Sequence, residues 1–120
     1  TLLAANILSL AEAMITLKSF DVYLETALSA INASSGRSWV SQQRFPDHVL
    51  SRTFDYGFSF GLHCKDVGIF GEMINDHNLE VSLLRKVLKT MQDAVVRLNH
   101  DDDHLKIIKM IEDQSGLTIQ

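Results

Sequence analysis

The chain has 120 residues, of which 46% are hydrophobic and 22% are charged. This balance is that of an ordinary globular domain and argues against intrinsic disorder, and the length suits one hydrophobic core, so we expect a single domain over residues 1–120. The formal net charge is −4, and no lysine and arginine cluster is interleaved with aromatic residues, which argues against nucleic acid as a partner.

Cys64 is the only cysteine, so no disulfide can form within the chain and we expect a cytoplasmic protein. No run of about 18 consecutive apolar residues is present, and the apolar start lacks the basic residues of a signal peptide. We therefore expect no membrane anchor and no membrane partner.

Helical spacing begins almost at the first residue. Ile7, Leu10 and Met14 belong to an apolar stripe that starts at Leu2, and only Thr1 precedes it. This helix has no lead-in, so we expect the chain to be a piece of a longer polypeptide in which the helix continues upstream. Glu12, within the stripe, is either a satisfied buried carboxylate or a residue at the helix edge.

Two short helices are expected next. Asp21 is suited to cap a helix that ends at Asn32. Residues 33–38 are small and polar and break the helical pattern. Ser38 is suited to cap a short helix that starts at Trp39 and is interrupted by Pro46.

The following segment predicts a turn at residues 55–57 and a helix from Phe58 to about Asp76. At about 100° per residue, four side chains would share one face of this helix. They are Phe58, Leu62, Lys65 and Ile69. Either the lysine is desolvated and meets a polar or anionic partner, with Gly61 and Gly68 letting a backbone or planar ligand approach, or its ammonium reaches water.

After a break at residues 77–78, two further helices are expected. An apolar stripe predicts a helix from Glu80 to Leu98, and a final helix should follow Asp101–Asp103. No alternating strand pattern and no repeat is present. The fold class is therefore an all-α multi-helix bundle.

Tests for chemistry carried by this chain alone mostly fail. A nucleotide-binding Gly-x-Gly-x-x-Gly motif is absent. Cys64 follows His63 directly, and adjacent helical residues point about 100° apart, so we interpret the thiol as a core cysteine rather than a nucleophile. His100 and His104 have a spacing that could hold a metal, but the adjacent aspartates are better explained as partners of a helix N-terminus, and we predict no metal site.

Five segments follow one another along the chain: Ala11-Glu12-Ala13-Met14, Ser35-Gly36-Arg37-Ser38-Trp39, Phe54-Asp55-Tyr56-Gly57-Phe58, Lys65-Asp66-Val67-Gly68 and Leu105-Lys106-Ile107-Ile108-Lys109. Their order resembles the C-terminal helical domain of the β-hydroxyacid dehydrogenases. This 6-phosphogluconate dehydrogenase-like superfamily includes 3-hydroxyisobutyrate dehydrogenase, tartronate semialdehyde reductase and L-threonate dehydrogenase. The resemblance covers nearly the whole chain, and the Lys-Asp pair and the serine-glycine loop are its most specific parts.

The resemblance implies an upstream Rossmann domain that binds NAD or NADP, and a helical domain that closes the active-site cleft and supports dimerisation as a homo-oligomer. It implies that Lys65 lies near the cofactor, that Phe58 lines the cleft, and that Asp66 helps to hold the catalytic centre. The family's catalytic lysine would lie just before Thr1, so this chain alone would be inactive.

For the longer protein we expect hydride transfer between a nicotinamide cofactor and a small hydroxy acid or its semialdehyde, with the upstream lysine as general acid or base. Ser35, Gly36 and Ser38 could offer hydroxyl and amide groups to the substrate, or could simply cap helices. The alternative function is a non-catalytic helical dimerisation or interaction domain, whose apolar stripes form a core and a dimer face.

Overall fold

The computed structural model describes residues 1–120 and contains helices and loops but no β-strand. The elements are α1 (Leu2–Ser19), α2 (Leu24–Asn32), the π-helix η1 (Val40–Leu50), α3 (Phe60–Asp76), α4 (Ser82–Ala94), the 3₁₀ turn η2 (His104–Lys106) and α5 (Ile107–Ser115). This confirms the expected all-α class.

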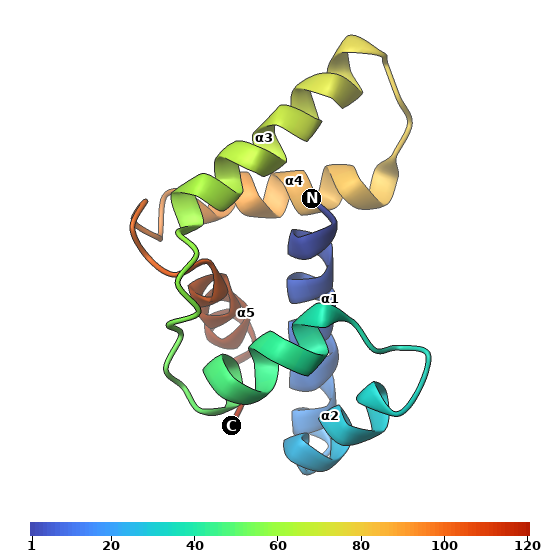
Figure 1. Cartoon of the computed structure of the whole chain (residues 1–120), viewed down its shortest axis with the longest axis vertical. Coiled ribbons are helices and arrows are strands. Elements are labelled where there is room, and N and C mark those ends of the chain that lie inside the picture. Colours follow the sequence, from blue (N-terminus) through green and yellow to red (C-terminus); the bar gives the residue numbers. More distant parts are fainter.

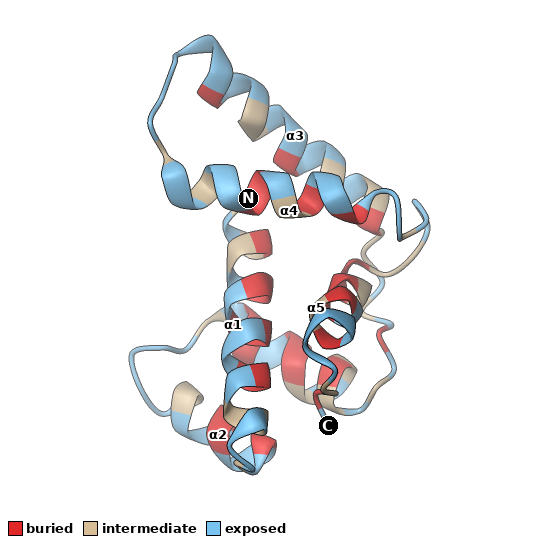
Figure 2. Ribbon diagram, turned by 180° about the vertical axis from the view of Figure 1, so that it is seen from behind, coloured by how far each residue is buried: buried red, intermediate tan, exposed pale blue.

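Helix α1 runs along the longest axis of the molecule, and the other elements pack around it (Figure 1). The α3 and α4 helices cross at its N-terminal end, α2 lies at its C-terminal end, and α5 lies beside it. The buried positions of α1 face α5 (Figure 2). They are Ala4, Ile7, Leu8, Leu10, Ala11, Met14 and Ile15. Glu12 is exposed, so it lies at the edge of the helix and is not a buried carboxylate.

By length and composition alone, α1 could cross a membrane, because its 18 residues have a mean hydropathy of 1.3. However, 39% of these residues are buried against the rest of the domain. The contacts of α1 with α2, α4, α5 and η1 therefore account for its apolar composition.

The predicted cap of the second helix is wrong. Asp21 does not open α2, which begins at Leu24 after an N-cap at Tyr23. Instead Asp21 has a φ of +58°, and the amide of Val22 donates to the carbonyl oxygen of Leu17. This is the left-handed turn that ends a helix, and aspartate tolerates it better than most residues, so Asp21 closes α1.

The expected cap at Ser38 is confirmed. Its hydroxyl accepts a hydrogen bond from the Ser41 amide at 3.1 Å, and its own amide donates to the Ser41 hydroxyl at 2.8 Å. The predicted interruption at Pro46 is wrong, because η1 continues through it to Leu50. The wider turns of a π-helix accommodate a ring and a missing N–H that a regular α-helix would not.

Helix α3 ends at Asp76 as expected but begins two residues later than expected. Ser59 is the N-cap, and its hydroxyl accepts from the Leu62 amide at 3.1 Å. Residues 58–61 are held by the segment 100–104, because the Phe60 amide donates to the carbonyl oxygen of Asp102 at 2.7 Å. This long-range pairing keeps Phe58 out of the helix, so Phe58 does not share a helical face with Lys65.

The last two helices confirm the expected order, with shorter bounds for α4. Leu88 and Met91 of its apolar stripe are buried, whereas Val95 lies beyond the helix and is exposed. Asp103 caps the turn before α5, since its carboxylate accepts from the Leu105 amide at 3.0 Å. The expected role of the acidic run at a helix start is therefore correct for Asp103.

Candidate functional site

The outer side of α3 carries exposed apolar side chains with a lysine among them. Leu62, Ile69 and Met73 keep 45%, 51% and 56% of their surface accessible, and Lys65 lies among them at helical spacing. We call these four residues the α3 face, and Figure 2 shows how exposed the outer side of this helix is. Such an apolar surface is typical of one that another chain segment or a ligand covers.

Lys65 and Asp66 form an ion pair at the surface of α3. The Lys65 Nζ lies 3.2 Å from the Asp66 Oδ1, and the two side chains are 63% and 55% exposed. The ammonium therefore reaches water, and the alternative of a desolvated lysine is wrong for this structure. An exposed pair of this kind contributes at most about 1 kcal/mol, so both charges are free to turn to a ligand.

The two glycines beside this face have different surroundings. A Cβ on Gly61 would lie 2.0 Å from Cδ2 of His100, and the Gly61 amide donates to the His100 carbonyl oxygen at 2.9 Å. The close partner at Gly61 is therefore the chain's own imidazole and backbone. A Cβ on Gly68 would meet nothing within 4 Å, so the surface beside Ile69 is open to an approaching group.

Phe58 packs on the inner side of α3, away from the α3 face. Its ring centroid lies 5.5 Å from that of His63 and 5.3 Å from that of His104. Its carbonyl oxygen accepts from the His104 amide at 2.9 Å and from the His104 Nδ1 at 3.2 Å. The structure thus does not place Phe58 beside Lys65 and Asp66.

The serine-glycine loop lies at a different height along the long axis from α3, beside the lower half of α1 in Figure 1. Gly36 and Ser38 line a hollow of about 250 Å³ with Asn6, Ser9 and other residues of α1 and α2. Ser38 is engaged in its cap, and Ser35 is exposed. The structure does not bring this loop to the α3 face.

Behind α3, four side chains from different parts of the chain form a polar cluster in which Tyr56 is half-buried and the other three are buried: Arg44, Tyr56, His63 and His104. The guanidinium of Arg44 lies 4.1 Å from the centroid of the Tyr56 ring. Ring centroids are 5.7 Å apart between Tyr56 and His104, and 5.5 Å apart between His104 and His63. Both ring nitrogens of His63 and the Nε2 of His104 are buried without a hydrogen-bond partner.

Burial keeps these two histidines neutral. Desolvation, with repulsion from His104 as the next cause, lowers the pKa of His63 to about 4. Desolvation also lowers the pKa of His104, against the opposing effect of Asp103. The His104 Nδ1 faces two acceptors, Phe58 O and the Asp103 carboxylate, so it carries the proton and leaves Nε2 as an acceptor.

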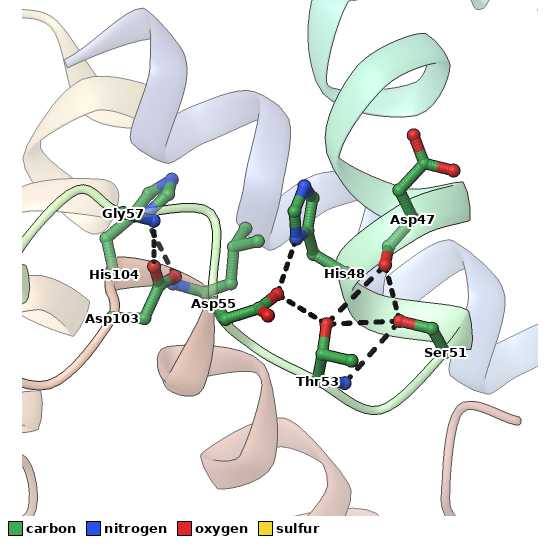
Figure 3. Close-up of polar contacts among 9 residues, drawn as sticks. Asp47, His48, Ser51, Thr53, Asp55, Gly57, Asp103 and His104 are labelled. Atoms are coloured by element: carbon green, nitrogen blue, oxygen red, sulfur yellow. Dashed lines mark hydrogen bonds and ion pairs between the residues drawn. The ribbon is translucent and has the colours of Figure 1, made fainter.

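Carboxylates order the segment that joins η1 to α3 (Figure 3). His48 Nδ1 lies 2.7 Å from Asp55 Oδ1, and the Thr53 hydroxyl donates to the same oxygen at 2.5 Å. The Thr53 hydrogen bond, followed by that of His48, lowers the pKa of Asp55. Asp103 accepts from the Gly57 amide at 2.8 Å, and Gly57 has a φ of +95°, as the predicted turn requires.

The two histidines considered as metal ligands face different surroundings. His100 pairs with Asp101 at the surface, whereas His104 is fully buried. No group of three His, Cys, Asp or Glu side chains is placed to hold a metal ion. Cys64 is half-buried and burial raises the pKa of its thiol, which agrees with its interpretation as a core cysteine.

Sequence reasoning missed Arg44 and Tyr56 and gave His63 no role of its own. A signal for His63 was present, because it shares one side of α3 with the buried residues Phe60, Val67 and Ile74. No periodic signal marks Arg44, which lies in the irregular turns of η1 next to Phe45 and Pro46.

Fold and site together define a helical domain that presents an exposed basic and apolar helix face. The family model described as NAD-binding of NADP-dependent 3-hydroxyisobutyrate dehydrogenase matches residues 1–111, and the chain belongs to this family. The expected β-hydroxyacid dehydrogenase resemblance is thereby confirmed. By its description, this family binds the cofactor of a dehydrogenase, and NAD(P) is its cofactor class.

Two relatives agree with this assignment. The 2-(hydroxymethyl)glutarate dehydrogenase of Eubacterium barkeri is 26% identical over 118 residues, which are 98% of this chain and 39% of that protein. The structure of Mycobacterium tuberculosis 3-hydroxyisobutyrate dehydrogenase with L-serine matches with a TM-score of 0.79 and 19% identity, over 92% of this chain and 40% of that chain. The chain thus spans about two fifths of each relative, and the second match shows a shared fold.

Proposed function

We propose that this chain is the helical domain of an NAD(P)-dependent dehydrogenase that acts on a small hydroxy acid or its semialdehyde. Family membership and the dehydrogenase relatives support this proposal. An upstream Rossmann domain would bind the cofactor, and the α3 face would close the cleft against it. The lone thiol Cys64 favours a cytoplasmic enzyme.

One observation carries the proposal: the α3 face combines exposed apolar side chains with an exposed ammonium, and the surface at Gly68 beside it is open. A nicotinamide ring is flat and partly apolar, and the rest of the cofactor is anionic. Lys65 can donate to such a ligand, with Leu62 and Ile69 against its apolar part. The residues present thus suit the cofactor, which when bound would accept a hydride from the hydroxy acid or, in its reduced form, donate one to the semialdehyde.

Asp66 would act through its neighbour. Its carboxylate lies 3.2 Å from the Lys65 ammonium and favours a position of that side chain on α3. In the longer protein an upstream lysine would exchange the proton of the substrate hydroxyl, and we place Asp66 as a positioning residue rather than a proton donor. Ser35, Gly36 and Ser38 remain predictions as substrate contacts, and their distance from α3 favours a structural role for Ser38.

The test compares two ion pairs of equal exposure in the full-length enzyme. Lys65→Ala should raise the KM for cofactor or lower kcat/KM by at least about tenfold, because a charge-assisted hydrogen bond is lost. Asp66→Asn should have a smaller effect in the same direction. Lys89→Ala is the control, because Lys89 and Asp93 of α4 form a similarly exposed pair, and it should change neither constant more than about twofold. Equal constants for Lys65→Ala and wild type would refute the site.

A role in self-association is supported by a second surface. The first half of α1 and α4 border an apolar hollow of about 370 Å³. Leu2 and Leu83 on its rim are both 72% exposed. We propose that this groove is a dimer face of the domain.

Light scattering of the 120-residue chain tests the dimer. A Leu83→Asp variant should halve the measured mass at micromolar concentration, whereas Val96→Asp, at an even more exposed position outside the groove, should not. A monomeric wild type would exclude this dimer face.

A further inference from the structure

Arg44 is almost buried and has no counter-ion. Only 8% of its surface is accessible, and its Nε is buried without a hydrogen-bond partner. Its guanidinium is held over the Tyr56 ring by a cation–π contact at 4.1 Å. No carboxylate of the chain forms an ion pair with it.

A guanidinium in this state is costly, because its Nε has lost water without gaining a hydrogen bond, and the contact with the Tyr56 ring replaces only part of the lost hydration. Arg52, which is also partly buried, has the counter-ion that Arg44 lacks. Both terminal nitrogens of Arg52 donate to the carboxylate of Glu112, which is itself buried. The absence of such a partner at Arg44 points to an anion from outside the chain.

The groups around Arg44 favour an anion with a single negative charge. His63 and His104 are neutral, and both have ring nitrogens free of hydrogen bonds. Asp103, the carboxylate that contacts His104, is already engaged by the Gly57 and Leu105 amides and by His104 itself. One unpaired cation beside two neutral rings, of which His63 can donate one hydrogen bond, matches a singly charged carboxylate better than a dianionic phosphate.

We propose that Arg44, with Tyr56 beneath it, forms a subsite for the carboxylate of a small organic acid. The planar guanidinium can donate two parallel hydrogen bonds to the two carboxylate oxygens. The stacking on Tyr56 fixes the plane of the fork, and Phe45 and Val49 bury the same helix against the core. The donor is thus already oriented before any anion binds.

Two sources could supply this carboxylate in the longer protein, and the first of them rests on the proposed function. One is the acid group of the hydroxy-acid substrate. The other is an aspartate or glutamate of the remaining polypeptide. The binding chemistry is the same in both cases, so it can be tested on the 120-residue chain without any measurement of dehydrogenase activity.

The test is an NMR titration of the 120-residue chain with sodium acetate, with sodium chloride reduced to keep the ionic strength constant. We expect saturable shifts of the Arg44 Nε–H and of the His63 ring signals. Arg44→Met should weaken binding at least about tenfold, because hydrogen bonds to a charged group are lost. Arg97→Met removes an exposed arginine and should bind acetate like the wild type.

Arg44→Met should still fold, because it replaces an unpaired charge by an apolar side chain of similar length. If Arg44→Met does not fold, Arg44→Lys is the variant to titrate, because it retains the charge but cannot donate two parallel hydrogen bonds. Non-saturable shifts, or equal binding by Arg44→Met and wild type, would overturn the proposal. In the longer protein, retained acetate binding would indicate a free acid as the natural occupant. Loss of acetate binding, restored by mutating an upstream acidic residue, would indicate a carboxylate of the polypeptide.

Discussion

His63 and His104 are the residues whose protonation this fold opposes most directly. Both lie in the core between α3 and η2, with the Arg44 guanidinium as a further positive charge near His63. A proton on the His63 ring would be a buried charge without a partner. A proton on His104 would face Asp103, but desolvation outweighs this attraction, so both rings stay neutral in the folded chain.

This predicts an acid-labile domain. The folded-state pKa of His63 is about 4, against 6.5 for an exposed histidine, so the unfolded chain binds more protons between these values. The contribution of neutral His63 is complete above pH 6.5 and is lost as the pH falls towards 4, by about 3 kcal/mol. His104 adds to the same loss. The pKa values of Asp55 and Asp102 are lowered from 3.8, so these carboxylates change the unfolding free energy only at pH values below this range.

Urea denaturation between pH 4.5 and 7 measures this effect. His63→Met should flatten the rise of unfolding free energy with pH, because it removes one of the two titrating groups and keeps an apolar side chain. His77→Gln removes an exposed histidine and should leave the slope unchanged. A slope in His63→Met equal to that of the wild type would show that the histidine is not the cause.

The arrangement of helices follows from periodic apolar residues, and this part was predictable. The stripes in α1 and α4 and the cap at Ser38 are local features that sequence spacing encodes. The errors at Asp21, Pro46 and Phe58 have a common physical origin. Each depends on backbone hydrogen bonds that the spacing does not reveal: a left-handed helix end, wide π-helical turns and the pairing of residues 58–61 with 100–104.

The candidate site was predictable only in part. The Lys65–Asp66 pair is a local motif, and its exposure agrees with a role towards a partner outside the chain. The Arg44 cluster is assembled from η1, the 51–57 segment, α3 and η2, so no local pattern marks it. Side chains that meet only through tertiary packing are beyond what periodicity can show.

At the scale of an element, α3 offers two glycines with opposite expected responses. Gly68→Ala should raise the unfolding free energy by about 0.5–1 kcal/mol, because alanine favours the helix and nothing lies near the new methyl group. Gly61→Ala should lower it, because the methyl group would overlap the His100 ring. Thermal and urea denaturation of both variants give the two values.

Repeating Gly61→Ala in the His100→Ala variant separates two effects on stability: steric overlap with the His100 ring and the change in helix propensity. Removing the ring should abolish most of the penalty of Gly61→Ala, and the coupling energy in a double-mutant cycle should exceed about 0.5 kcal/mol. If Gly61→Ala is equally destabilising without the His100 ring, the close approach of the two backbones is responsible instead, since the Gly61 amide donates to the His100 carbonyl oxygen.

At the scale of the whole molecule, one buried carboxylate joins three distant parts of the chain. Glu112 of α5 accepts two hydrogen bonds from Arg52, which precedes α3, and one at 2.7 Å from the amide of Ile119. Arg52 also donates to the Ile119 carbonyl oxygen at 3.2 Å, and Ile119 is fully buried. The C-terminal segment is therefore held to the core by Glu112.

Glu112→Gln tests this connection. The amide can still accept from Ile119 but leaves Arg52 without a counter-ion, so the unfolding free energy should fall by about 1–3 kcal/mol, less than for a fully buried pair because Arg52 is partly exposed. Asp93→Asn breaks the exposed pair on α4 and should cost less than about 1 kcal/mol. Hydrogen exchange should show faster exchange of the Ile119 amide in Glu112→Gln alone. Equal losses for the two variants would mean that Glu112 acts as a surface charge, and the C-terminal segment would then depend on the packing of Ile119.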